Sequence, residues 1–372
     1  MNDRFENINL LRAFAATAVV VYHVIEYANW SSFPTDGPLL TFSIGWIGVD
    51  LFFVISGFVI TRSALALWLQ DPAAFAGRYW ARRAARIVPL YLLTCALWVV
   101  LFKRDWFDHD TTRLLWQIAS HMTFTHSFWP VTYSSIDGVN WTLALEMQFY
   151  LVVAMFVPWL ARTPGWRIWV GCILIAWAWR GAMVWFFGHY EPVRLFMRVM
   201  QLPGALDEFG AGVFLAKLLD RRPATSTRDG AFWALGAVAA GVVCFGLYWS
   251  NSSYWDLPAM VTFWRTSLAA LFLCVVAAAV HLPTVAWSWP LRPVWYLGEV
   301  SYGIYLWHLF AIEVCLWLRY LTPVQFLVVT LCLTVLAAAT SWHFFEKPIL
   351  DRARRYGAPR SHQPRSVIPD LP

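Results

Sequence analysis

Long apolar stretches recur along the chain and are separated by short polar segments. Each stretch approaches the roughly 20 residues that an α-helix needs to cross a hydrocarbon core of about 30 Å. The pattern therefore predicts an all-α, polytopic integral membrane protein with about ten transmembrane helices. The predicted spans are residues 8–28, 44–69, 87–102, 141–160, 167–187, 203–219, 231–249, 262–281, 297–318 and 324–344.

Basic residues in the short loops predict the orientation of these spans, because Arg and Lys accumulate on the cytoplasmic side. The densest basic run before the tail holds Arg78, Arg82, Arg83 and Arg86, which places the N-terminus inside. Residues 112–128 are helical in pattern but rich in polar side chains, so we expect an outer-face or re-entrant segment there. With that assignment, both termini are cytoplasmic.

Composition agrees with a membrane protein and excludes several other classes. The chain is 59% hydrophobic and 13% charged, which leaves too little polar surface for a soluble domain. Its net charge of +6 comes from loops and tail and gives no indication of nucleic-acid binding. The six Cys stand singly in apolar runs, so we expect neither a disulfide framework nor a metal site.

The chain is expected to form one domain followed by a tail. Residues 1–350 are predicted to be the transmembrane domain, and residues 351–372 a basic cytoplasmic tail without fixed structure after Tyr356. The first span is longer than the apolar core of a secretory signal and lacks a clean cleavage site. We therefore interpret it as an uncleaved anchor.

The first span carries two polar side chains, Arg12 and His23. Eleven residues correspond to about three helical turns, so both lie on one helix face, roughly 16 Å apart. A charge inside a span costs about 2.5–3.5 kcal/mol and usually faces a partner or a water-filled cavity. Arg12 as a membrane-edge anchor and His23 as a structural histidine are the alternatives. Together they predict anion binding at one depth and proton chemistry at another.

Two carboxylates are predicted at the depth of His23. Counting helical rise from the span ends places Glu146 and Asp50 within a few ångströms of its level. A carboxylate paired with His23 would orient the ring, while the other ring nitrogen acts as a general base. The alternative is that these buried charges only pair with one another in lipid.

Other polar groups complete the candidate site. Arg12, Arg83 and Arg86 at the inner face could clamp phosphates, or could be topology signals that contact lipid headgroups. His308 ends a polar stripe that begins at Ser301, where structural hydrogen bonding is the alternative to catalysis. An anion clamp some 16 Å below a reactive histidine suits coenzyme A, although a prenyl-phosphate sugar has a similar shape.

Six short motifs, taken in order, resemble the acyltransferase-3 family of membrane acyltransferases. They are residues 9–13 with His23, 48–58, 82–89, 140–150, 301–308 and 346–348. The resemblance implies ten spans and transfer of an acyl group, usually acetyl, from cytoplasmic acyl-CoA to a carbohydrate hydroxyl at the outer face. It also implies that His23 is the catalytic histidine and that Arg12, Arg83 and Arg86 bind the donor. Glu146 matches the acidic position of the family.

These observations lead us to expect a multi-pass O-acyltransferase of the inner membrane that acetylates a surface or secreted polysaccharide or its lipid-linked precursor. His23 would be the catalytic base or acyl carrier, oriented by Glu146 or Asp50. Trp141, Tyr302 and His308 are the expected substrate contacts, with residues 103–140 as the acceptor surface.

The expected partners are the lipid bilayer, acyl-CoA, the carbohydrate acceptor and other polysaccharide-assembly proteins. No metal is expected. The resemblance implies that some relatives carry a fused extracytoplasmic hydrolase-like domain, which we do not expect here, so the chain would act alone or with a separate partner. A polysaccharide transporter or flippase, and a non-catalytic scaffold, are the competing functions.

Overall fold

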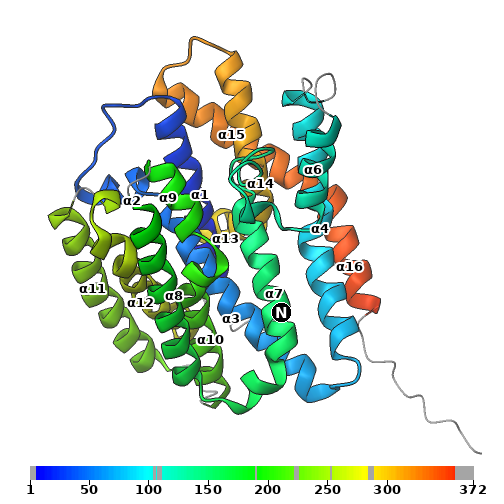
Figure 1. Ribbon diagram of the computed structural model, residues 1–372, viewed down its shortest axis with the longest axis vertical. Helices are drawn as coiled ribbons and strands as arrows, with labels where there is room; N and C mark the ends of the chain where they lie inside the picture. Colours follow the sequence, from blue (N-terminus) through cyan, green and yellow to red (C-terminus); the bar gives the residue numbers. More distant parts are fainter. Residues whose placement is uncertain are drawn as a thin grey trace, which may run out of the picture.

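The computed structural model describes residues 6–103, 106, 111–188, 191–221, 226–251, 254–283 and 289–356. Within these residues every regular element is a helix, which confirms the all-α prediction (Figure 1). The longer helices are α1 (Asn7–Tyr27), α3 (Ile47–Gln70), α4 (Phe75–Phe102), α7 (Trp141–Arg162), α8 (Gly165–Phe187), α10 (Leu206–Arg221), α11 (Thr227–Ser250), α12 (Pro258–His281), α14 (Ser301–Trp317) and α15 (Pro323–Ser341).

Shorter helices connect these elements or extend them. They are α2 (Leu40–Ser43), α6 (Thr111–Met122), α9 (Pro192–Val199), α13 (Arg292–Glu299) and α16 (Lys347–Tyr356). Short 3₁₀ turns are formed by Gly37–Leu39, His126–Phe128, Leu202–Ala205, Tyr254–Asp256 and Trp289–Leu291. A π-helical turn, Trp342–Glu346, joins α15 to α16. Residues 357–372, most of the predicted tail, lie outside the described residues.

The described residues contain eight helices long and apolar enough to span a membrane, or nine if α13 and α14 form one span bent by 79°. The polytopic prediction is therefore confirmed, whereas the count of ten is not. The predicted span 203–219 corresponds to α10, which has 16 residues and is about 24 Å long. That length is shorter than a hydrocarbon core of about 30 Å. The placement of the termini stays a prediction.

The segment expected at the outer face is also too short to cross. Its helix α6 has 12 residues, or about 18 Å. The chain then makes the 3₁₀ turn His126–Phe128 and continues without regular structure to α7. A single straight span through residues 112–128 is therefore excluded.

Helix α1 is central to the fold, because it packs against α2, α3, α12, α13, α14 and α15. Figure 1 shows α8, α10, α11 and α12 on one side of the molecule and α4, α6 and α16 on the other. Small residues permit the close packing of α1 against α3. A Cβ atom at Gly48 would lie 2.5 Å from Ala15 O, so a larger residue would separate these helices. This contact holds the polar face of α1 against its neighbours.

Candidate active site

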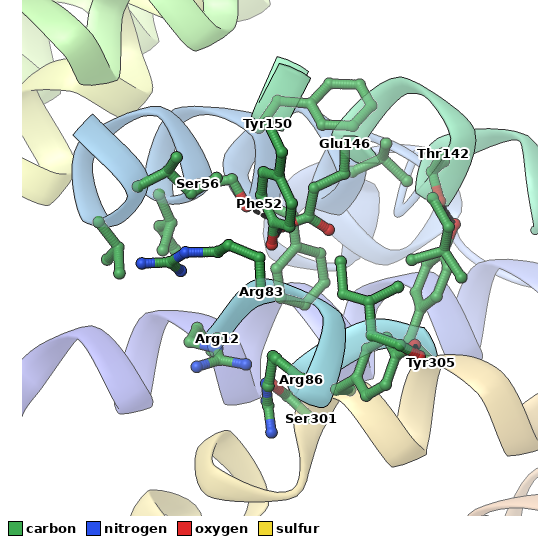
Figure 2. Close-up of a pocket in the computed structure, with 18 residues that line it drawn as sticks. Arg12, Phe52, Ser56, Arg83, Arg86, Thr142, Glu146, Tyr150, Ser301 and Tyr305 are labelled. Atoms are coloured by element: carbon green, nitrogen blue, oxygen red, sulfur yellow. Dashed lines mark hydrogen bonds between the residues drawn. The ribbon is translucent and has the colours of Figure 1, made fainter. Parts of the chain in front are cut away.

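A cavity of about 150 Å³ lies among α1, α3, α4, α7 and α14. Its polar lining includes Arg12 from α1, Arg83 and Arg86 from α4, and Glu146 from α7. Figure 2 shows the three guanidinium groups in one part of the cavity, with Thr142 and Tyr305 in another. Residues from five helices thus form one site.

Aromatic rings and one carboxylate hold the two arginines of α4 that line the cavity. The Arg83 guanidinium lies 5.8 Å from the ring centre of Tyr79 and 5.7 Å from that of Tyr150. Arg86 lies 5.3 Å from the Tyr302 ring centre, and its Nη1 is 3.8 Å from Glu346 Oε2. Flat guanidinium groups stacked in this way keep their edges available for an oxyanion.

Arg12 differs from Arg86 because no hydrogen bond or ion pair joins it to another residue in the described part of the chain. Around the cavity, Arg12, Arg83 and Arg86 face two carboxylates, those of Glu146 and Glu346. Three positive charges against two negative charges leave an excess of one. Because the cavity is partly closed off from solvent, this excess favours an anionic ligand.

Glu146 belongs to this cavity. Ser56 Oγ and the Tyr150 hydroxyl both donate to its Oε1, over 2.9 Å and 2.8 Å. Its other carboxylate oxygen has no hydrogen-bond partner among the described residues. Ser56, Tyr150 and Glu346 were not among the predicted site residues, although each lies within one of the sequence motifs.

His23 contacts a second histidine. Its Nδ1 lies 3.0 Å from Val19 O and 3.1 Å from His308 Nε2, and the two ring centres are 5.0 Å apart. His308 Nδ1 in turn lies 2.7 Å from Tyr305 O. The predicted pairing of His23 with Glu146 or Asp50 is therefore wrong. Glu146 accepts hydrogen bonds from Ser56 and Tyr150, and Asp50 is paired with Arg265.

Asp50 is part of a separate buried ion cluster. It forms an ion pair with Arg265 of α12, whose Nη1 also lies 3.6 Å from Glu208 Oε1 of α10. Asp50 and Glu208 have no exposed surface, and neither lines the cavity. Arg265 was the sequence signal for this cluster, since an arginine inside an apolar span requires a partner.

The three predicted substrate contacts lie in different places. Tyr302 lines the cavity, where its hydroxyl donates to Ile87 O over 2.7 Å. Trp141 packs against Tyr133 and Phe196, with ring centres 5.7 Å and 5.2 Å away, and is not part of the cavity lining. His308 is fully buried against His23.

Tyr305 stands between the cavity and the histidine pair. Its ring lines the cavity and lies 6.1 Å from that of Phe52. Its hydroxyl is 2.9 Å from Thr142 Oγ1. Its carbonyl oxygen lies within hydrogen-bond distance of His308 Nδ1. Tyr305 therefore contributes its ring to the cavity and its carbonyl oxygen to the histidine pair.

The end of α6 and the segment between α6 and α7 bury several titratable groups. The rings of His121 and His126 stack in parallel with centres 4.1 Å apart. Burial lowers the pKa of His121 to about 4 and that of His126 to about 3. Burial also raises the pKa of Asp137 to about 7. Among the described residues, no group of three or more His, Cys, Asp or Glu could hold a metal ion.

The family model for an acyltransferase domain matches residues 5–345. The chain belongs to the acyltransferase-3 family. This match covers most of the chain and confirms the resemblance that the motifs indicate. The cavity arginines and the histidine pair all lie within the acyltransferase-3 region.

Individual relatives are more distant. The provisionally named peptidoglycan O-acetyltransferase YrhL of Bacillus subtilis is 28% identical over 370 residues, covering 91% of this chain and 54% of the relative. The peptidoglycan O-acetyltransferase OatA of Listeria monocytogenes is 24% identical over 362 residues, with coverage of 92% and 55%. The provisionally named membrane-bound transacylase BcsY of Komagataeibacter xylinus is 28% identical over 323 residues, with coverage of 82% and 72%.

This acyltransferase-3 chain spans about half the length of the first two relatives. No solved structure matches it.

Proposed function

We propose that this chain is a membrane O-acyltransferase that moves an acetyl group from acyl-CoA to a hydroxyl group of a cell-surface or secreted polysaccharide or its lipid-linked precursor. The observation that carries the proposal is the cavity lined by three arginines and Glu146, with Glu346 paired to one of those arginines, Arg86. Its unpaired Arg12 lies on the same face of α1 as His23. The names of the YrhL and OatA relatives make a peptidoglycan-like polymer the first acceptor to test.

The arginines are proposed to bind the phosphates of coenzyme A. Guanidinium groups bind phosphate through two parallel hydrogen bonds, which fixes the orientation of the ligand as well as its position. Arg12 and His23 are separated by eleven residues, or roughly 16 Å along α1. A phosphate-bearing ligand with a long thin arm can span this distance, provided that Phe52 and Tyr305 move aside.

His23 is proposed to act as the general base. Its Nε2 takes the proton from the acceptor hydroxyl while the hydroxyl oxygen attacks the thioester carbonyl carbon. The carbon–sulfur bond then breaks, and the coenzyme A thiolate leaves and takes the proton back from His23. A covalent acyl-histidine intermediate is the alternative route, in which Nε2 itself attacks the carbonyl carbon.

The test uses purified protein in lipid nanodiscs with radiolabelled acetyl-CoA and glycan acceptors that include peptidoglycan fragments. We expect His23→Ala to lower turnover by at least about 100-fold, the usual scale of general-base catalysis. Arg12→Ala should raise KM for acetyl-CoA by at least about tenfold, because a charge-assisted hydrogen bond is worth about 1.5–3 kcal/mol.

Two control variants test whether the effects are specific to Arg12 and His23. Each removes a residue of the same type outside the cavity and the histidine pair. Arg78→Ala removes an arginine of α4 that is paired with Asp71 outside the cavity. His281→Gln replaces a buried histidine whose Nδ1 contacts the carbonyl four residues earlier, as in His23. Unchanged turnover in His23→Ala would remove the catalytic assignment. A folded wild type that binds no acyl-CoA would contradict the proposed function and favour a transporter.

A further inference from the structure

The contact between His23 and His308 joins two helices that are far apart in sequence. His23 lies on α1 and His308 on α14, and the nitrogen atoms that face each other are 3.1 Å apart. His308 has no exposed surface, whereas His23 is partly exposed. As the side chains stand, only His23 can meet a substrate.

The carbonyl groups around the pair determine where the ring protons lie. A carbonyl oxygen only accepts hydrogen bonds, so His308 Nδ1, at 2.7 Å from Tyr305 O, carries a proton. His23 Nδ1, at 3.0 Å from Val19 O, carries one for the same reason. His308 Nε2 is then unprotonated and accepts a hydrogen bond from His23 Nδ1–H. The same N–H also donates to Val19 O.

The opposite arrangement would require two unfavourable features. If His308 Nε2 donated to His23 Nδ1, His308 would carry a proton on both nitrogens as a fully buried cation. No carboxylate lies within ion-pair distance of it in the part of the chain that the structure describes. The lone pair of His23 Nδ1 would also face that of Val19 O. Both features are costly in an apolar surrounding.

We propose that His308 is a positioning residue that fixes His23 with its lone pair on Nε2. This inference rests on the proposed function, because it assigns a role in orienting the catalytic base. When His23 Nε2 takes a proton, its Nδ1–H stays bonded to His308 Nε2, whose lone pair stabilises the new positive charge. An uncharged partner does this without placing an ion pair in lipid before the reaction begins.

This role differs from the substrate contact predicted from the sequence. A residue that binds substrate directly would change KM for the substrate, whereas one that orients the base changes kcat. His308→Leu removes the acceptor at similar side-chain size. His308→Gln keeps an oxygen close to the position of Nε2 and is the conservative variant.

The first measurement compares kcat and both KM values for wild type, His308→Leu and His308→Gln in nanodiscs. We expect His308→Leu to lower kcat by about 10- to 100-fold, by analogy with the loss of the hydrogen-bond partner that orients a metal-bound imidazole. The KM for acetyl-CoA should stay within about twofold, and His308→Gln should recover much of kcat. Unchanged kcat in His308→Leu, or a change confined to KM, would overturn the proposal.

The second measurement does not depend on turnover. Nitrogen NMR of protein labelled with ¹⁵N-histidine distinguishes protonated from unprotonated ring nitrogens, and the His23 signals are assigned by their loss in His23→Gln. We expect protonated Nδ1 and unprotonated Nε2 at His23 in the wild type, and a mixture of the two neutral forms in His308→Leu.

The two measurements separate the possible failures. A protonated His23 Nε2 in the wild type, or an unaltered spectrum in His308→Leu, overturns the positioning role whatever the enzyme does. Absence of acetyl transfer in a wild type with the expected spectrum contradicts the proposed function while supporting the ring arrangement.

Discussion

Glu346 Oε2 lies 3.8 Å from Arg86 Nη1 and so connects the π-helical turn after α15 to the arginine cavity. The hydroxyl of Ser341 donates to the other carboxylate oxygen of Glu346 over 3.2 Å. A π-helical turn inserts one residue into the helical repeat and often marks a functional site. Here it brings an acidic side chain beside a cation that is proposed to bind phosphate.

The first prediction concerns the charge of Glu346. Glu346→Gln keeps the size and the hydrogen-bonding capacity near Arg86 but removes a negative charge that repels a phosphate. At a separation of about 8 Å, this repulsion amounts to about 0.5–2 kcal/mol, depending on the effective dielectric constant. We expect coenzyme A to bind about 2- to 30-fold more tightly, measured by titration calorimetry in nanodiscs.

Glu299→Gln, on α13 outside the cavity lining, serves as the control for this measurement. Weaker binding of coenzyme A in Glu346→Gln would mean that Glu346 orients Arg86 more than it repels the ligand. A lack of dependence on ionic strength would contradict the electrostatic explanation altogether.

The second prediction concerns the stability of the ion cluster around Asp50. Asp50→Asn leaves the buried Arg265 with Glu208, at 3.6 Å, as its one carboxylate partner among the described residues. Removing one partner of a buried ion pair costs about 3–5 kcal/mol. We therefore expect a clearly lower Tm in detergent, with near-normal specific activity in the fraction that remains folded.

A matched substitution at an exposed acidic residue, Asp229→Asn at the start of α11, should leave Tm nearly unchanged. Adding Arg265→Leu to Asp50→Asn leaves Glu208 unpaired, so Tm should not recover in this double variant. If activity per folded molecule disappeared in Asp50→Asn, Asp50 would have a role in the reaction after all.

The third prediction is a pH dependence of stability that is due to Asp137. Burial raises the pKa of its carboxyl from 3.8 to about 7, so the folded state holds a proton that the unfolded state has lost. Stability is therefore greatest at low pH within this window and falls as the pH rises from about 4 to about 7. The titratable groups that interact with it, Tyr27, Tyr91, Cys95 and Tyr305, supply no positive charge.

Asp137→Asn isolates this contribution. The buried His121 and His126 have lowered pKa values, so their effect is opposite: stability rises as the pH increases from about 3 to 6.5. Because the histidines are present in both proteins, the difference in Tm between wild type and Asp137→Asn reports the carboxyl alone. We expect the variant to gain relative to wild type between pH 5 and pH 8, and a constant difference would contradict the assignment.

The arrangement of the arginines could be predicted from sequence, whereas the partner of His23 could not. Arg12, Arg83 and Arg86 belong to short motifs that occur in a fixed order, and the structure places them in α1 and α4, where all three line one cavity. The depth calculation placed Glu146 beside His23 from helical rise alone. In the structure, Glu146 lines the cavity together with Arg12 and accepts hydrogen bonds from Ser56 and Tyr150.

A single sequence also does not specify how each helix is rotated about its axis or which helices pack against one another. Spacing along α1 predicts that Arg12 and His23 share a face, but it does not say which helix lies opposite. The small residues that bring α1 against α3, such as Gly48 opposite Ala15, have no directional signal in a single sequence. His308 was recognisable as a buried polar residue, yet its place beside His23 follows only from the packing of α14 on α1.

The last prediction concerns the length of the acyl chain. We propose that an acyl group moving from the arginine cavity to His23 passes Phe52 and Tyr305, two residues of the cavity lining whose ring centres are 6.1 Å apart. A short acetyl group meets less obstruction there than a longer chain does. Phe52→Ala removes one side of this constriction without touching an arginine or a histidine.

We expect Phe52→Ala to raise kcat/KM for butyryl-CoA relative to acetyl-CoA by at least about tenfold, since butyryl is two methylenes longer and each methylene in a shaped pocket is worth about 1–3 kcal/mol. The ratio is independent of the folded fraction, so a loss of stability does not affect the result. Val59→Ala enlarges the same cavity from the same helix, two turns from Phe52. It should leave the ratio unchanged, and an equal shift in both variants would mean that the constriction does not select the donor.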